Sequence, residues 1–158
     1  MHGRARLRLT LTRRQHFSTA ALIGAAVVLS ACSRPPEVAL APQASAPACA
    51  SAAWPAEVGG HQRVPTQPDH GSVAAWGEPA IIARCGLDPL GPTTDDCVTV
   101  DGVDWVVRPL SDGSAATTYG RDPAIEVLAP AQYGAVPLLL PAFTSLARTL
   151  PENGRRCT

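Results

Sequence analysis

The sequence predicts an α+β domain, in which a small antiparallel sheet carries one or two helices packed on one face and is stapled by disulfides. Three observations lead to this fold class. Residues 98–107 have the pattern of a β-hairpin, apolar residues recur at helical spacing between 139 and 150, and four cysteines are spread over residues 49–157. The chain has 158 residues, a length typical of one domain.

The hairpin is the clearest of the expected elements. Asp101-Gly102 separates two runs in which apolar and polar residues alternate, and this dipeptide favours a type I′ turn because both positions need a positive φ. The turn fixes the register, which places Thr99 opposite Asp104 on the wetter face. The core face of the hairpin then holds Val98, Val100, Val103 and Trp105.

Further strands are expected where short β-prone runs end at turn residues. In the last of them, Ile125 and Val127 share one face and Glu126 points the other way. The three runs cover residues 80–84, 115–119 and 124–128.

Two helices are expected at the ends of the domain. In the C-terminal one, Pro141 suits the first turn and Pro151 follows the end. A shorter helix is expected over residues 49–54, stopped by Pro55, beside the C-terminal one. The apolar positions of the C-terminal helix are Leu139, Phe143, Leu146 and Leu150.

Residues 1–31 have the features of a secretory signal peptide. Five arginines and no acidic residue precede an uncharged stretch of 12 residues at positions 20–31. That stretch is shorter than the roughly 20 residues that span a bilayer. It ends in Leu29-Ser30-Ala31-Cys32, which matches a lipobox, so Cys32 is the expected site of lipid attachment. The alternative is a buried apolar helix that ends in an ordinary cysteine.

The export route stays open between general secretion and twin-arginine transport, because residues 12–17 (TRRQHF) only approach the twin-arginine pattern. Residues 32–47 are rich in Pro, Ala and Ser and are expected to form an extended tether. The folded extracytoplasmic domain is expected to cover residues 48–158.

The charges are unevenly distributed along the chain. Thirteen arginines balance thirteen acidic residues, but removal of residues 1–31 leaves eight arginines against thirteen acids, a net charge of −5. An acidic domain without lysine lacks the clustered basic face that a nucleic-acid binder needs. Nucleic-acid binding is therefore excluded as the expected function.

The remaining cysteines are expected to form two disulfides, since their number is even and the chain is expected to be exported. The favoured pairs are Cys85–Cys97, which closes a short loop, and Cys49–Cys157, which ties the ends of the domain together. A zinc site is the alternative, but the sequence has no closely spaced cysteine pair.

Four runs in the domain form a recognisable set, residues 76–86 (WGEPAIIARCG), 100–105 (VDGVDW), 117–121 (TTYGR) and 155–157 (RRC). They resemble motifs of the actinobacterial lipoprotein family known as domain of unknown function 3515. The resemblance extends in order from Cys49 to Thr158, with the four cysteines in place. It implies an exported, membrane-anchored protein of unassigned activity and provides no catalytic residue to transfer.

The candidate ligand-binding residues lie in these runs. Asp104 together with Arg84 or Arg121 could line a charged cleft for a polar ligand, against the plainer alternative of structural ion pairs. Trp76 and Trp105 could form a platform for a sugar or peptide, although core packing is the favoured interpretation for both.

Other chemistry has weak support in the sequence. His61, Asp69 and His70 could supply metal ligands, but their spacing fits no common site and an exposed loop is favoured. No G-x-S-x-G or P-loop motif is present, and no catalytic residue, metal or cofactor is expected. The favoured function is a non-enzymatic envelope lipoprotein that binds an envelope protein or wall component. A small envelope hydrolase and a structural subunit with a large apolar face are the alternatives.

Overall fold

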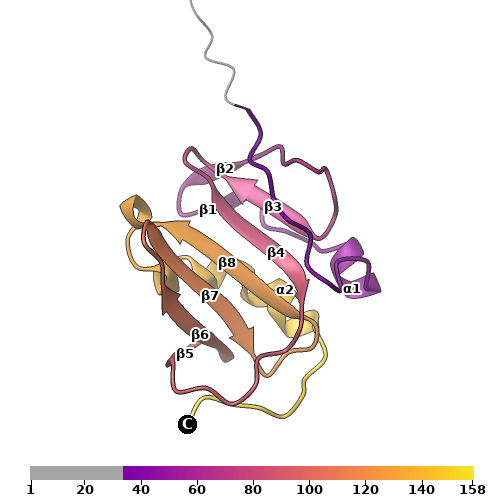
Figure 1. Cartoon of the computed structure of the whole chain (residues 1–158), viewed down its shortest axis with the longest axis vertical. Coiled ribbons are helices and arrows are strands. Elements are labelled where there is room, and N and C mark those ends of the chain that lie inside the picture. Colours follow the sequence, from indigo (N-terminus) through magenta and orange to yellow (C-terminus); the bar gives the residue numbers. More distant parts are fainter. Residues whose placement is uncertain (1–33) are drawn as a thin grey trace, which may run out of the picture. The chain divides into compact units, whose positions relative to one another are not determined.

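The computed structural model describes residues 34–158, which form one antiparallel sheet with short helices on one side (Figure 1). The predicted signal peptide and Cys32 lie outside the described residues. The eight strands are β1 (Glu57–Val58), β2 (His61–Val64), β3 (Val73–Trp76), β4 (Ile81–Leu87), β5 (Asp96–Val100), β6 (Val103–Pro109), β7 (Gly113–Tyr119) and β8 (Ala124–Pro130).

The sheet consists of two runs of neighbouring antiparallel strands that meet at β4 and β8. Its strand order is β1-β2-β3-β4-β8-β7-β6-β5, and every pair of neighbouring strands is antiparallel. After β4, residues 88–95 carry the chain to the far edge, where β5 begins. The chain then returns strand by strand until β8 pairs with β4. This single long connection allows two local meanders to share one sheet.

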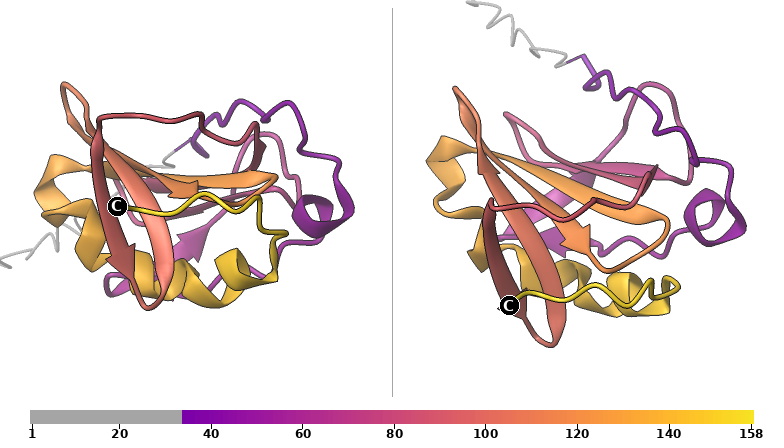
Figure 2. Two further views of the ribbon diagram at one scale, coloured as in Figure 1. Left: turned by 90° about the horizontal axis from the view of Figure 1, so that it is seen from below. Right: turned by 60° about the horizontal axis from the view of Figure 1, so that its bottom comes forward.

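Short helices cover one face of the sheet (Figure 2). Four follow β8 and one precedes β1, so the chain enters and leaves the sheet through helical segments. Prolines at positions 137 and 141 favour tight turns here, because they lack the N–H that a regular α-helix needs. The helices are α1 (Pro47–Ala50), η1 (Ala131–Tyr133), η2 (Val136–Leu138), η3 (Leu140–Phe143) and α2 (Thr144–Thr149).

The fold class is confirmed in its antiparallel sheet and disulfides but was wrong in the size of the sheet. The sheet dominates the described chain, and the helices are short. The main omission was β1 to β3. Strand β3 reads VAAW and is buried at all four positions, so it lacks the alternation that marks a half-exposed strand. The expected helix over 139–150 is divided between η3 and α2.

The expected hairpin is confirmed. Val98 pairs with Trp105 and Val100 with Val103, as the turn register requires. Asp101 and Gly102 have φ angles of 48° and 76°, which fit a type I′ turn. The opposite face is drier than expected, because Asp104 is only 8% exposed.

Aromatic rings form the centre of the core between the sheet and the helices. Trp76 and Phe143 meet edge to face with their ring centroids 5.4 Å apart, and Trp54 lies 6.3 Å from Trp76. Such edge-to-face pairs are favourable beyond the apolar area that they bury. Leu140 and Leu150 from the helical segments are also buried. The predicted apolar positions of the C-terminal segment therefore do face the core.

The segment that precedes α1 is packed on the domain, unlike the extended tether expected over residues 32–47. Pro36 accepts a hydrogen bond from the N–H of Gln67 (2.9 Å), and Val38 donates one to the carbonyl of Gln67 (2.8 Å). Further along, the N–H of Gln43 donates to the carbonyl of Gly86 (2.8 Å). In Figure 1 this segment leads from the start of the described chain to α1. The buried side chains of the segment are Val38, Ala41 and Ala44.

Glycine at position 86 permits this docking. Gly86 has a φ of +107°, and a Cβ there would lie 2.5 Å from the carbonyl carbon of Gln43. A side chain would therefore be strained by its own backbone and would also collide with the docked segment.

We expect Gly86→Ala to destabilise the domain by about 1–3 kcal/mol and to loosen residues 36–46, because the new methyl group needs the space that Gln43 occupies. Limited proteolysis should show faster cleavage within this segment. Gly91→Ala is the matched control, since a Cβ at Gly91 meets nothing within 4 Å. Equal cleavage of the two variants would contradict the docked arrangement.

Candidate functional site

Two buried or half-buried disulfides hold the described chain together, and their pairing differs from the prediction. Cys49 bonds to Cys85, and Cys97 bonds to Cys157. The favoured pairs Cys85–Cys97 and Cys49–Cys157 were wrong. Because β8, β7 and β6 lie between β4 and β5, four strand spacings of about 4.8 Å separate Cys85 from Cys97, far beyond disulfide reach.

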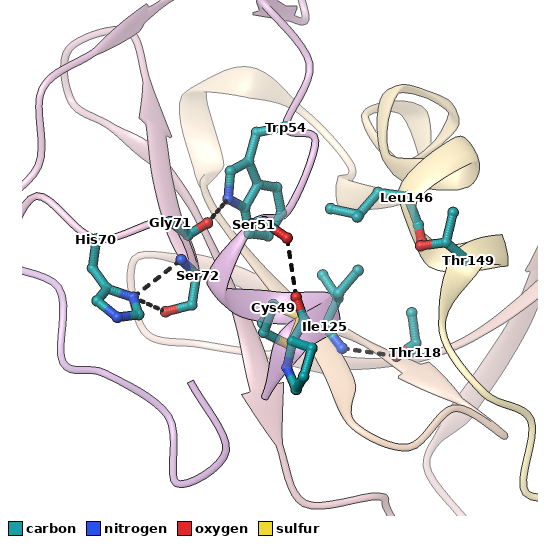
Figure 3. Close-up of a disulfide and its surroundings, with 12 residues drawn as sticks. Cys49, Ser51, Trp54, His70, Gly71, Ser72, Thr118, Ile125, Leu146 and Thr149 are labelled. Carbon is teal, nitrogen blue, oxygen red and sulfur yellow. Dashed lines mark hydrogen bonds between the residues drawn. A yellow bond between two sulfur atoms is a disulfide. The ribbon is translucent and has the colours of Figure 1, made fainter. Parts of the chain in front are cut away.

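The Cys49–Cys85 disulfide joins α1 to β4 inside the core (Figure 3). Both cysteines have no exposed surface. Trp54 follows shortly after and donates its indole N–H to the carbonyl of Gly71 at 2.8 Å. This disulfide therefore fixes the start of the domain and is closed to solvent.

The candidate residue Trp76 is a core residue. Its side chain is fully buried, and its indole N–H donates to the carbonyl of Pro55 at 3.0 Å. Trp105 is equally buried, as the hairpin pattern predicted. Neither indole presents a surface to a ligand, so the proposed aromatic platform is not formed and core packing holds for both.

The candidate residue Arg84 forms a charged cluster with two residues that the sequence analysis did not select. Glu126 is the cross-strand partner of Arg84 and is only 3% exposed. Both Nε and Nη2 of Arg84 lie 2.7 Å from Oε2 of Glu126. Nη2 of Arg108 lies 3.4 Å from Oε1 of the same carboxylate. One buried carboxylate thus holds two guanidinium groups on the sheet face opposite the helices.

The Arg84–Glu126–Arg108 cluster has a surplus positive charge at the surface. The side chain of Arg84 is 28% exposed and that of Arg108 is 46% exposed. Two cations share one anion, so part of their hydrogen-bonding capacity faces solvent. Guanidinium groups bind carboxylates and phosphates in a planar, two-pronged geometry. Chemically, the exposed parts of the two guanidinium groups are suited to holding an anionic group.

Asp104 and Arg121 both bind residues 151–157, which are here called the C-terminal strap. Asp104 accepts hydrogen bonds from the hydroxyl of Thr99 (2.6 Å) and the N–H of Cys157 (2.9 Å). Arg121 is 6% exposed and donates to the carbonyl of Leu150 at 2.9 Å. Arg84, Asp104 and Arg121 thus each have structural partners, as in the plainer alternative to a ligand cleft, and Arg84 lies in the Arg84–Glu126–Arg108 cluster.

Glu152 of the strap pairs with two arginines, Arg121 in the turn after β7 and Arg156 within the strap itself. Its Oε1 lies 3.0 Å from Nη2 of Arg121, and its Oε2 lies 2.7 Å from Nη2 of Arg156. The hydrogen bond and charge of Arg156, followed by the charge of Arg121, lower the pKa of Glu152. The hydrogen bond from Arg156 to Glu152 in turn raises the pKa of Arg156.

A pocket of about 280 Å³ opens beside this strap and has a polar wall. The Cys97–Cys157 disulfide and the neighbouring Arg156 form part of that wall. The charged side chains of the lining are Asp95, Asp96 and Arg156, and because Arg156 is paired with Glu152, the two aspartates leave the pocket acidic. Its lining residues are Thr93, Thr94, Asp95, Asp96, Cys97, Tyr119, Arg156, Cys157 and Thr158.

The two histidines have structural contacts rather than a common centre, and His61 begins strand β2, whereas an exposed loop was expected there. The ring of His61 lies 4.5 Å from that of Tyr133, centroid to centroid. His70 Nδ1 accepts from the backbone N–H of Ser72 at 3.2 Å and lies 2.8 Å from its hydroxyl oxygen. Asp69, which precedes His70, is exposed. Within residues 34–158, no three His, Cys, Asp or Glu side chains converge as a metal site would require.

These observations define a class: an antiparallel β-sheet domain with short helices and two disulfides. The chain belongs to the family described as Protein of unknown function (DUF3515), whose model matches residues 17–153. The resemblance noted from the sequence is therefore confirmed. No curated protein matches the chain, and no solved structure matches it. Among residues 34–158, no helix is long and apolar enough to cross a bilayer.

We expect Glu126→Gln to destabilise the domain by about 1–2 kcal/mol, because two guanidinium groups lose the carboxylate that they share. The exposure of both arginines keeps the loss below that of a fully buried pair. Urea denaturation with the disulfides intact is the measurement. Glu78→Gln, at an exposed position, should stay within about 0.5 kcal/mol. A Glu126 variant as stable as this control would show that the cluster does not stabilise the fold.

We expect the C-terminal strap to loosen in acid. The pKa of Glu152 is lowered in the folded state, so its ion pairs stabilise the strap above the ordinary glutamate pKa of about 4.3 and are lost as pH falls through the lowered value. Amide exchange should report this at the N–H of Asn153, which donates to Gly120. Glu152→Gln should remove the acid-dependent step. A step of unchanged size in this variant would assign it to another group.

Proposed function

We propose that this protein is a membrane-anchored lipoprotein whose disulfide-bonded domain acts outside the cytoplasm as a non-enzymatic binding or accessory protein of the cell envelope. The observation that carries the proposal is the run Leu29-Ser30-Ala31-Cys32 at the end of a 12-residue uncharged stretch with basic residues before it. Two acyl chains, each methylene contributing about 0.8 kcal/mol, are sufficient for stable attachment.

The cysteines of the domain support this location. Each of the four cysteines in residues 34–158 is already bonded, so none of them is left there to pair with Cys32. Disulfides persist in oxidising compartments outside the cytoplasm. The net charge of −5 without residues 1–31 disfavours attachment to anionic lipid by charge alone, so the acyl group would supply the membrane affinity.

The Arg84–Glu126–Arg108 cluster supports a binding role. It presents partly exposed guanidinium groups on the sheet face opposite the helices, where an anionic group of an envelope protein or wall component could be held. A serine hydrolase would need an accessible serine beside its histidine base. The hydroxyl of Ser72 lies 2.8 Å from His70, but Ser72 has no exposed surface. This geometry disfavours the serine form of the alternative, a small envelope hydrolase.

We expect Cys32→Ser to abolish acylation and to move the protein from the membrane fraction to the soluble fraction, because the sulfur of Cys32 is the atom that receives the lipid. Metabolic labelling with a fatty-acid analogue and mass spectrometry of the processed N-terminus measure the two effects. Ser33→Ala is the matched control and should keep both the label and the membrane fraction. Labelling that persists in Cys32→Ser would refute the proposed anchor.

A further inference from the structure

Most of the segment between the proposed anchor and α1 is docked on the surface of the domain. The carbonyl of Pro36 and the N–H of Val38 both bond to Gln67, and Glu37 forms a parallel bridge with the same residue. The side chain of Val38 is 6% exposed. The chain is therefore held on the domain surface from Pro36 onward.

A second fixed point prevents this segment from acting as a long linker. Gln43 bonds to Gly86 through its backbone and to Asp88 through its side-chain amide, at 2.8 and 3.0 Å. Ala41 and Ala44 are buried on either side of this contact. Extension of residues 36–47 would break both sets of bonds and expose these side chains to water.

The remaining covalent reach is short. Only Ser33, Arg34 and Pro35 lie between Cys32 and Pro36, so the Cα atoms of Cys32 and Pro36 can be at most about 14 Å apart. A tether extended over residues 32–47 would have reached about 50 Å. The difference decides how far the domain stands from a lipid attached at Cys32.

We infer that the surface around Pro36, Glu37 and Gln67 faces the phospholipid bilayer at close range, with the C-terminal strap directed away from it. This inference rests on the proposed lipid anchor. Figure 1 shows that the described chain begins at one end of the domain and that its C-terminus lies at the opposite end. The short link between Cys32 and Pro36, and the end of the domain at which Pro36 lies, therefore select the bilayer as the occupant of this surface.

The charges of this end are compatible with a bilayer surface. The exposed residues Arg34 and Arg63 are balanced by Glu37 and Asp69. A balanced surface neither binds anionic headgroups strongly nor is repelled by them, so the short link determines the position of the domain.

The test uses the acylated full-length product in phosphatidylcholine and phosphatidylglycerol vesicles that carry a nitroxide on the lipid headgroup. A fluorescent non-natural residue replaces Gln67 at the inferred near end or Thr94 beside the C-terminal strap; both positions are exposed. We expect several-fold stronger quenching at position 67, because nitroxide quenching acts only over short distances.

The matched control inserts about 20 Gly and Ser residues between Ser33 and Arg34, which adds a root-mean-square reach of about 25 Å. Quenching at position 67 should then fall to the level seen at position 94. Equal quenching at the two positions of the acylated protein, or no change on insertion, would overturn this inference and leave the anchor standing. A Cys32 that carries no diacylglycerol by mass spectrometry would overturn both.

Discussion

Strands β4 and β8 lie about 40 residues apart in the sequence, and their pairing joins the two halves of the sheet. Five residue pairs connect them, and Arg84 opposite Glu126 is one of these pairs. The carboxylate of Glu126 is buried, so it needs a cation at that position. The remaining architecture depends on this seam, because within the sheet β1 to β3 connect to the other half only through β4, and β5 to β7 only through β8.

The two disulfides act on either side of this seam. Cys49–Cys85 attaches the N-terminal helix to β4, and Cys97–Cys157 attaches the C-terminal strap to the edge strand β5. Each therefore closes a chain end onto a strand that is already placed, and neither spans the seam. In the chain-entropy account, loops of 36 and 60 residues contribute about 4 kcal/mol each.

Local patterns in the sequence predicted local structure, whereas strand order decided the features that were missed. The Asp101-Gly102 turn set the hairpin register correctly, and the same register already placed Cys97 on the face opposite Trp105. A core partner for Cys97 was thus disfavoured by the sequence. Its actual partner could not be identified, because that required knowing that the strap passes over β5. Arg84 was selected as a charged residue, but its partner Glu126 became evident only when β4 was placed beside β8.

The docked N-terminal segment shows why composition alone misjudged residues 36–47. Arguments from composition ask whether a segment can bury enough apolar surface by itself. Here small side chains such as Ala41 and Ala44 pack on a sheet that exists without them, and Gly86 leaves the space that the segment's backbone occupies. A proline-rich segment also loses less conformational entropy when it becomes ordered, since each proline ring already fixes φ. Docking of such a segment therefore needs only a modest buried area.

The surface charge gives the domain two regions of opposite character. Its net charge is negative, yet the Arg84–Glu126–Arg108 cluster is locally positive because two cations share one anion. Screening limits the influence of the distant acids to about 8 Å at physiological ionic strength. An anionic group that approaches this face therefore meets mainly the two guanidinium groups. Since Glu126 orients both of them from a buried position, their side chains would lose little further entropy if they bound the anionic group proposed above, which favours affinity.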